Sequence, residues 1–218
     1  MQLIGMLDSP YVRRVAISLQ LLGLRFEHRP VSVFRTFDEF RRINPVVKAP
    51  SLVCDDGEVL MDSTLILEYA EALAAPKSLM PRGPAERQHA LRIIGLALAG
   101  CEKSAQILYE RTLRPADKQH EPWLSRVTGQ LLAAYGELES ELARRPLRAA
   151  AGSIGQPAIT AAVAWYFSRD ILPDLVDPAA HPHLQTLSAQ AETLPAFRAA
   201  PYGPGTYGAG PAAAGDTV

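Results

Sequence analysis

The fold is decided by one stretch, Leu3-Ile4-Gly5-Met6-Leu7-Asp8-Ser9-Pro10-Tyr11-Val12-Arg13-Arg14. It begins as a short apolar run of strand character and continues, after a serine and a proline, with helical periodicity. Ser9 is a favoured N-cap residue and Pro10 a favoured first helical residue. A helix N-terminus also gathers amide donors and the positive end of the helix dipole, so it stabilises a thiolate, phosphate or carboxylate. From these residues alone, Ser9 is either a plain cap or the hydroxyl of an anion site.

Composition and charge exclude several classes of protein. The chain has 218 residues, 48% hydrophobic and 21% charged, enough for one large domain or two small ones. Lys and Arg number 22 against 23 Asp and Glu, so no basic excess is present to bind a nucleic-acid backbone. No basic start with a following apolar stretch and no long apolar run occurs, which argues against secretion and membrane spanning. We expect a cytoplasmic protein that binds neither nucleic acid nor membrane.

The two cysteines, Cys54 and Cys101, form neither a disulfide framework nor a metal-binding knuckle. Each lies in apolar sequence, where the role of a small buried hydrophobic residue is expected. We therefore expect no metal site.

The first 75 residues alternate between strand and helix patterns. An apolar strand at the N-terminus is followed by a helix that ends at Gly23, and strand character returns over Phe26–Val33. A crossover connection of this length makes the two strands parallel. A short helix is expected around Asp38–Arg42.

A hairpin and a helix complete this part. Asp55-Asp56-Gly57 separates two short apolar runs, and Asp-Gly suits the positive φ of a tight hairpin turn, so the two strands should be antiparallel. Asp62-Ser63 then precedes a helical face over Thr64–Leu73 and supplies its cap. The predicted order through residue 73 is βαβαββα.

The rest of the chain is predicted to be helical. Residues 76–85 are rich in proline with little periodicity, as in a linker, and residues 86–200 form an all-helical domain. Within it, Pro157–Ile171 is apolar nearly all round and is expected to be the central buried helix. Residues 201–218 are dominated by Gly, Pro and Ala, so this tail is predicted to be disordered or loosely draped.

The order of elements, the linker and three motifs together resemble a glutathione S-transferase over residues 1 to about 200. The motifs are Ser9-Pro10-Tyr11-Val12-Arg13 at the start of the first helix, Asn44-Pro45-Val46-Val47-Lys48-Ala49-Pro50 before the third strand, and Asp62-Ser63 before the third helix. The resemblance implies a thioredoxin-like βαβαββα domain at residues 1–75, which binds glutathione. The all-α helical bundle at residues 86–200 would add the second-substrate site.

The resemblance also implies a glutathione-binding role for five residues. In the family, the proline that matches Pro50 has a cis peptide bond, and the preceding residue, here Ala49, pairs through its backbone with the cysteinyl part of glutathione. Asp62 and Ser63 would bind the ammonium and carboxylate of the γ-glutamyl group. Lys48 would lie near the glycine end, although a solvated lysine is an open alternative.

Ser9 would then be the catalytic residue that faces the sulfur of glutathione. A hydroxyl donor at a helix N-terminus favours the thiolate without acting as a base itself. Tyr11 is the second hydroxyl nearby. Serine rather than cysteine at position 9 argues for conjugation and against thiol-disulfide reduction.

The second-substrate pocket is expected to be apolar and to accept a small hydrophobic electrophile. Its predicted lining is Leu7, Tyr11, Cys101, Ser104, Ala105 and Leu108. One departure from the family lies at Gly155-Gln156-Pro157-Ala158, where the usual capping box of the central helix is absent.

The predicted function is that of a cytosolic, homodimeric glutathione transferase of the detoxification type, with glutathione as its co-substrate and no metal. The alternative is a glutathione-binding or protein-interaction module of the same fold with little or no turnover, because a fold does not fix an activity.

Overall fold

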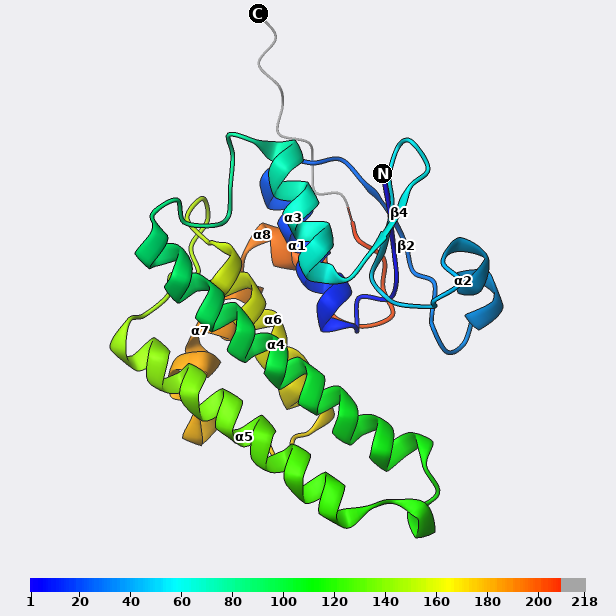
Figure 1. Cartoon of the computed structure of the whole chain (residues 1–218). Coiled ribbons are helices and arrows are strands. Elements are labelled where there is room, and N and C mark those ends of the chain that lie inside the picture. The colour runs from blue at the N-terminus through cyan, green and yellow to red at the C-terminus, as the bar shows by residue number, and fades with distance from the viewer. Residues whose placement is uncertain (209–218) are drawn as a thin grey trace, which may run out of the picture. The chain divides into compact units, whose positions relative to one another are not determined.

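The computed structural model describes residues 1–208 and divides the chain into two compact units (Figure 1). The first comprises Met1–Leu79 together with the segment from Thr193 onward, and the second comprises Met80–Glu192. The change of unit after Leu79 falls inside the proline-rich stretch 76–85. The sequence placed the end of the helical domain at residue 200, whereas the structure returns to the first unit at Thr193.

A four-stranded sheet forms the centre of the first unit. Its strands are β1 (Gln2–Ile4), β2 (Glu27–Arg29), β3 (Ser51–Val53) and β4 (Val59–Met61), in the order β2-β1-β3-β4. β1 pairs with β2 in parallel, and β3 is antiparallel to both β1 and β4. The predicted crossover and hairpin are therefore confirmed, with strands shorter than the apolar runs suggested.

Helices cover both faces of this sheet. α1 (Pro10–Leu22) and α3 (Ser63–Ala74) pack together on one side, and α2 (Phe37–Ile43) lies on the other (Figure 1). Phe40 of α2 is buried with Ile4 and Val31 in one apolar cluster. The order βαβαββα is thus as predicted.

The C-terminal segment returns to α1. The short helix α8 (Pro195–Ala199), which the sequence did not predict, packs on α1 with Phe197 fully buried. Arg13 Nε donates a hydrogen bond to the Ala200 carbonyl at 2.8 Å, and its guanidinium lies 5.7 Å from the centre of the Phe197 ring. The burial of the Phe197 ring and the hydrogen bond from the buried Arg13 hold this segment in place.

The described part of the tail is held against β2 rather than loosely draped. The Tyr207 ring lies 4.6 Å, centre to centre, from the ring of Phe26, and the Tyr207 N–H donates to His28 at 3.0 Å. Composition alone missed this because one aromatic side chain, that of Tyr207, supplies the contact. The predicted tail residues 209–218 lie outside the described residues.

The second unit is a helical bundle. Its helices are α4 (Pro84–Leu113), α5 (Glu121–Arg144), α6 (Gln156–Ile171) and α7 (Pro182–Glu192), with short 3₁₀ turns at Ala116–Lys118 and Pro178–Ala180. α6 packs against α4 and α7 and is buried on nearly every side, as its composition predicts. Gly155 caps α6 with no side-chain hydrogen bond, in line with the missing capping box.

Buried polar contacts fix the helices of this unit. Ser168 Oγ lies 2.6 Å from both Ser104 Oγ and the Tyr135 hydroxyl, and Tyr135 also donates to the Ala164 carbonyl. Such a satisfied network rigidifies a core. Cys101, in the same stretch of α4, is buried as expected.

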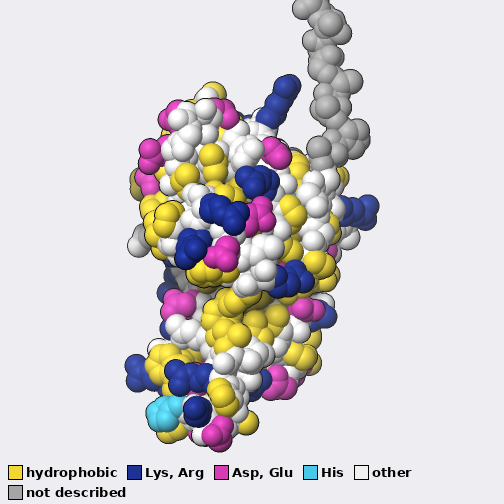
Figure 2. Space-filling view, turned by 90° about the vertical axis from the view of Figure 1, so that its right-hand side faces the viewer, with side chains coloured by type: hydrophobic (Ala, Val, Ile, Leu, Met, Phe, Trp, Pro, Cys, Tyr) yellow, Lys and Arg dark blue, Asp and Glu magenta, His cyan; other side chains and the backbone are white. Residues whose placement is uncertain are grey.

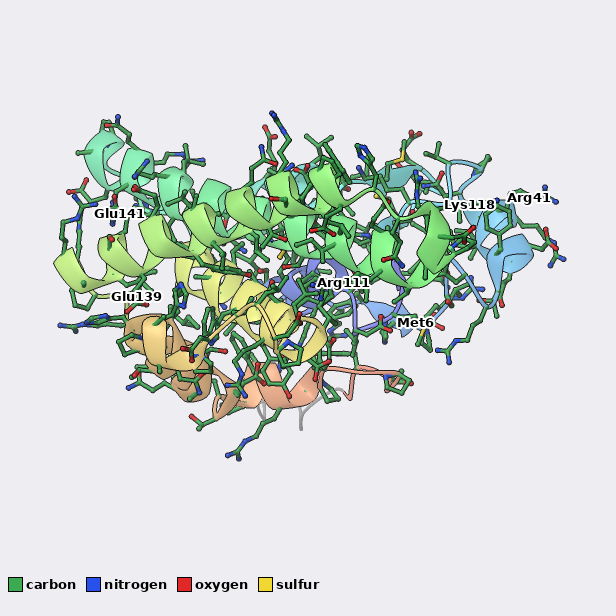
Figure 3. The ribbon with its side chains drawn as sticks, turned by 90° about the horizontal axis from the view of Figure 1, so that it is seen from below. Met6, Arg41, Arg111, Lys118, Glu139 and Glu141 are labelled. Atoms are coloured by element: carbon green, nitrogen blue, oxygen red, sulfur yellow. The ribbon has the colours of Figure 1, made fainter. Side chains whose placement is uncertain are left out.

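Two glutamates of α5, labelled in Figure 3, bind neighbouring helices of this unit. Glu141 accepts hydrogen bonds from Arg92 at 2.8 Å and Arg144 at 2.6 Å. Glu139 accepts the first N–H groups of α7, from His183 and Leu184. Burial raises the pKa of Glu139, but those N–H donors and the His183 ring outweigh it and lower the pKa overall.

Gly100 and Gly95 give a matched test of packing in α4. A Cβ at Gly100 would lie 2.8 Å from the Tyr135 ring, whereas a Cβ at the exposed Gly95 meets nothing within 4 Å. We expect Gly100→Ala to lower the free energy of unfolding by roughly 1–3 kcal/mol and Gly95→Ala to raise it by about 0.5–1 kcal/mol. Urea unfolding measures both. Equal effects of the two substitutions would contradict the close approach of Tyr135.

Candidate functional site

Ser9 caps α1 at the end of the loop that follows β1. Its Oγ accepts the Val12 N–H at 3.4 Å, and its backbone is extended, with φ −73° and ψ 121°. Because Oγ acts as an acceptor in this bond, its own hydrogen remains available to an anion. No acidic side chain lies in the first turn of α1, so no residue of the helix itself neutralises the positive end of its dipole.

Gly5 brings this loop close to a second one. Its φ is +137°, and a Cβ at this position would lie 2.6 Å from a methyl of Val12 and 3.2 Å from the Ala49 Cβ. Only glycine adopts this backbone angle easily, and only glycine leaves room for both neighbours. The start of the Ser9 loop therefore packs directly against the predicted backbone-binding residue Ala49.

Buried polar contacts hold the loop that carries Ala49. Asn44 Nδ2 donates to Ser51 Oγ at 2.8 Å, its Oδ1 accepts the Val46 N–H at 3.0 Å, and Ser51 Oγ donates to the Lys48 carbonyl at 2.8 Å. Val47 has φ +53°, which is rare for a β-branched residue and indicates strain. The Ala49-Pro50 peptide bond is cis, as the resemblance implies.

Asp62 stands at the start of α3 in a strained conformation, with φ +74°. One carboxylate oxygen caps the helix by accepting the Thr64 N–H at 2.9 Å, and the other lies 3.5 Å from Lys48 Nζ. The sequence placed these two residues at opposite ends of glutathione, whereas the structure brings their charges together. Both remain about half exposed, so the pair is open to a ligand.

Arg14 is a residue that the sequence reasoning missed. It is 2% exposed, and its guanidinium donates to Ser63 Oγ at 3.1 Å and to Thr64 Oγ1 at 3.5 Å. It therefore places a positive charge at the N-terminus of α3, where a carboxylate is favoured. A signal was present, because α1 is apolar on nearly all sides and two adjacent arginines in it must find polar partners.

Asp8 is the second residue that was missed. Desolvation raises the pKa of its carboxyl, although the Ser9 N–H and the charge of Arg35 act in the opposite direction. A carboxyl beside Ser9 opposes a neighbouring anion when ionised. Because its pKa is raised, this opposition is relieved at a higher pH than for a fully solvated aspartate.

The six predicted pocket residues belong to different units. Leu7 and Tyr11 lie in the first unit, with Leu7 fully buried. In the second unit, Cys101 and Ser104 are buried, and the Ser104 hydroxyl is bonded to Ser168, while Ala105 and Leu108 are partly exposed. Of the four pocket residues predicted in α4, only Ala105 and Leu108 therefore have exposed surface.

The first unit thus gathers two helix N-termini, the loop with the cis Ala49-Pro50 bond, and the charges of Arg14, Lys48 and Asp62. These groups suit a small zwitterionic peptide that carries an anion at its centre. Among residues 1–208, no group of three His, Cys, Asp or Glu side chains is arranged to hold a metal ion.

Comparison with known proteins decides the family. A model of the glutathione S-transferase N-terminal domain matches residues 3–78. The uncharacterised GST-like protein YibF of Escherichia coli is 30% identical over 188 residues, which cover 86% of this chain and 91% of YibF. The chain belongs to the glutathione S-transferase family.

Other members of the glutathione S-transferase family extend the comparison. The maleylacetoacetate isomerase of Pseudomonas aeruginosa is 32% identical over 135 residues, 57% of this chain and 63% of that protein. A Methylobacterium radiotolerans glutathione S-transferase, solved in complex with glutathione sulfonate, has a TM-score of 0.83 at 27% identity, covering 90% of this chain and 92% of that one. Among residues 1–208 of the present chain, no helix is long and apolar enough to span a membrane.

Figure 2 shows one face of the protein, on which hydrophobic side chains are interspersed with charged ones. Around α2, the exposed hydrophobic residues are Phe34, Phe37 and Val46. None of these three residues is among the site residues that the resemblance implies.

Asp62→Asn separates the charge of Asp62 from its capping role. Asparagine caps helices about as well as aspartate and tolerates positive φ, so we expect stability to change by less than about 0.5 kcal/mol. Loss of the carboxylate should weaken glutathione binding about tenfold, or about 1.4 kcal/mol, by calorimetry. Asp56→Asn is the control, because Asp56 also accepts the N–H two residues later but lies in the hairpin turn. Equal loss of affinity in both variants would argue against a ligand at Asp62.

Proposed function

We propose that this chain is a glutathione-dependent enzyme in which Ser9 stabilises the thiolate of glutathione for attack on a small hydrophobic electrophile. One observation carries the proposal: the Ser9 hydroxyl stands at the N-terminus of α1, whose first turn holds no acidic side chain. The binding of glutathione sulfonate by a structural neighbour at 27% identity supports the choice of ligand.

The binding mode follows from the charges of the first unit. The carboxylate of the γ-glutamyl group suits the N-terminus of α3, where Arg14 binds Ser63, and its ammonium suits Asp62. The cysteinyl backbone pairs with Ala49, beside the cis bond to Pro50. This orientation directs the sulfur toward Ser9, because Gly5 joins the Ala49 loop to the Ser9 loop.

The chemistry needs only one ionisation. The thiol of glutathione loses its proton to solvent, and the resulting thiolate accepts a hydrogen bond from Ser9. Its electron pair then forms the new S–C bond, while the electrophile either releases a leaving group with the bonding pair or takes up a proton after addition. Ser9 keeps its own proton throughout and acts by stabilising charge.

A second candidate reaction is glutathione-dependent isomerisation, which the 32% identity to maleylacetoacetate isomerase favours. The same thiolate would add to a double bond and leave again, so glutathione would be regenerated. Consumption of glutathione by a substrate separates the two reactions. The binding-only alternative differs from both, because it predicts a thiolate without turnover.

The proposal also includes the cellular location and the oligomeric state of the protein. We infer a cytoplasmic, homodimeric protein of the detoxification type. Sedimentation measures the oligomeric state.

Substitution of Ser9 tests the proposed role of its hydroxyl. We expect Ser9→Ala to raise the pKa of the bound glutathione thiol by about 1–2 units, because one hydrogen bond to an anion contributes about 1.5–3 kcal/mol. The ultraviolet absorbance of the thiolate, titrated with pH at saturating glutathione, measures the shift. Affinity for S-methylglutathione, which has no ionisable thiol, should stay within about twofold.

Tyr11→Phe is the matched control, because it removes the other nearby hydroxyl and keeps the ring. It should leave the thiol pKa unchanged. A shift in Tyr11→Phe with none in Ser9→Ala would move the role to Tyr11. Failure of the native protein to bind millimolar glutathione would refute the proposed function as a whole.

A further inference from the structure

His28 joins the C-terminal segment to the loop that carries Ser9. It lies at the centre of the edge strand β2, and the residue is 7% exposed. Its Nε2 lies 2.7 Å from the Gly5 carbonyl oxygen, and its Nδ1 lies 3.0 Å from the Tyr207 backbone nitrogen. Both ring nitrogens are therefore bonded to backbone, at two points 202 residues apart in the sequence.

These partners determine the tautomer of His28. The Tyr207 N–H is a donor, so Nδ1 must accept, and the Gly5 carbonyl is an acceptor, so Nε2 must carry the proton. Only the neutral imidazole with its hydrogen on Nε2 satisfies both bonds. A doubly protonated ring would place an Nδ1–H against the N–H of Tyr207.

The Gly5 end of this link belongs to the candidate site. Gly5 donates its N–H to the Arg29 carbonyl at 3.1 Å and packs against Val12 and Ala49. It begins the short loop that ends at Ser9. The hydrogen bond from His28 fixes the remaining polar group of Gly5. The direction in which the loop leaves β1 thus depends on both backbone bonds.

The Tyr207 end is fixed by several contacts. Arg13 holds the Ala200 carbonyl, the Gly208 N–H donates to the Ala199 carbonyl at 2.9 Å, and the Tyr207 ring packs on Phe26 at 4.6 Å. The segment 200–208 therefore forms a closed loop that presents the Tyr207 N–H to His28.

We propose that His28 is a positioning residue for thiolate formation: it holds the Gly5 carbonyl, and the C-terminal segment holds His28 in the neutral tautomer that can do so. This inference rests on the proposed function for its catalytic consequence. Its structural part, the coupling of Tyr207 to the Ser9 loop through one ring, does not.

Besides its two hydrogen-bond partners, nearby charged groups could affect the protonation of His28, so their positions matter. Alternation along β2 directs Glu27 and Arg29 to the face opposite His28, and Arg29 pairs with Glu39 there. Other charged or titratable groups on the surrounding elements include the Met1 ammonium bound to Asp55, Asp8 after β1, and the Tyr207 hydroxyl. On α1 they include Arg13, bound to Ala200, and Arg14, bound to Ser63.

Acid should break the hydrogen bond between the Tyr207 N–H and His28 Nδ1. Burial lowers the pKa of His28, against the raising effect of its hydrogen bond to Gly5. A histidine with a lowered pKa stabilises the folded form fully above its ordinary pKa of about 6.5. That contribution is lost as the pH falls toward the pKa in the folded state. The docked segment should therefore be most stable at neutral pH.

Two substitutions of His28 separate its two bonds. The amide nitrogen of glutamine reaches the position of Nε2, so His28→Gln keeps a donor for Gly5 and loses the acceptor for Tyr207. The amide oxygen of asparagine reaches the position of Nδ1, so His28→Asn keeps the acceptor for Tyr207 and loses the donor for Gly5. Hydrogen exchange of the Tyr207 amide and the pH titration of bound glutathione thiolate are the two readouts.

We expect opposite patterns in the two variants. In His28→Asn the Tyr207 amide stays protected, and the pKa of the bound thiol rises by roughly one unit, a tenfold loss of thiolate. In His28→Gln the Tyr207 amide loses at least about tenfold of its protection, and the thiol pKa stays within a few tenths of a unit. Equal shifts of the thiol pKa in both variants, or in neither, would overturn the positioning role.

Failure of this inference is distinguishable from failure of the proposed function. If the native protein binds no glutathione, the amide resonance of Ser9 still reports the loop. His28→Asn should then move that resonance and His28→Gln should not. An unmoved Ser9 resonance in His28→Asn refutes the coupling, whatever the ligand.

Two shortened chains test the role of the C-terminal segment. A chain that ends at Thr206 lacks the donor to Nδ1, and one that ends at Gly208 retains it. We expect the pKa of His28, followed by nitrogen chemical shifts, to be higher in the chain that ends at Thr206. The acid limb of its thiolate titration should move up in the same direction. Identical His28 titrations in the two chains would contradict the control of His28 by Tyr207.

Discussion

The close approach at Gly5 is the constraint on which the site depends. Val12 of α1 and Ala49 of the loop before β3 occupy the space where a side chain would stand, and the Gly5 N–H and C=O are both bonded to β2. Because one residue without a side chain meets three elements, the cap at Ser9 and the backbone at Ala49 are placed together. Neither loop could move without the other.

Around this point, the site is built mainly from backbone groups and helix ends. Ser9 and Asp62 cap α1 and α3, and Arg14 joins the two helix starts by bonding to Ser63. The strained angles at Val47 and Asp62 are maintained by buried contacts such as those of Asn44. Strain of this kind costs about 1–3 kcal/mol per residue, so its occurrence at the predicted binding residue Asp62 and directly before the predicted binding residue Lys48 is consistent with a functional requirement.

Periodicity predicted the order of elements and the parallel and antiparallel pairings, because strands, crossover and turn each follow from local sequence. It indicated only that the arginines of α1 need polar partners. The identity of the partner of Arg14 and the raised pKa of Asp8 depend on contacts between distant segments. Composition predicted a loose tail and missed the docking of Tyr207, because one aromatic ring and one backbone N–H have no periodic pattern. The roles of Ser9, Lys48 and Ala49 came from the family resemblance, since three short motifs alone are compatible with ordinary caps and turns.

A crystal structure of the chain with glutathione tests most directly whether a thiolate is held at the start of α1. We predict that the sulfur lies within hydrogen-bond distance of Ser9 Oγ, about 3.0–3.5 Å, with the cysteinyl backbone paired to Ala49. A sulfur bound at the Tyr11 hydroxyl, or a tripeptide that does not contact Asp62 and Ala49, would contradict it.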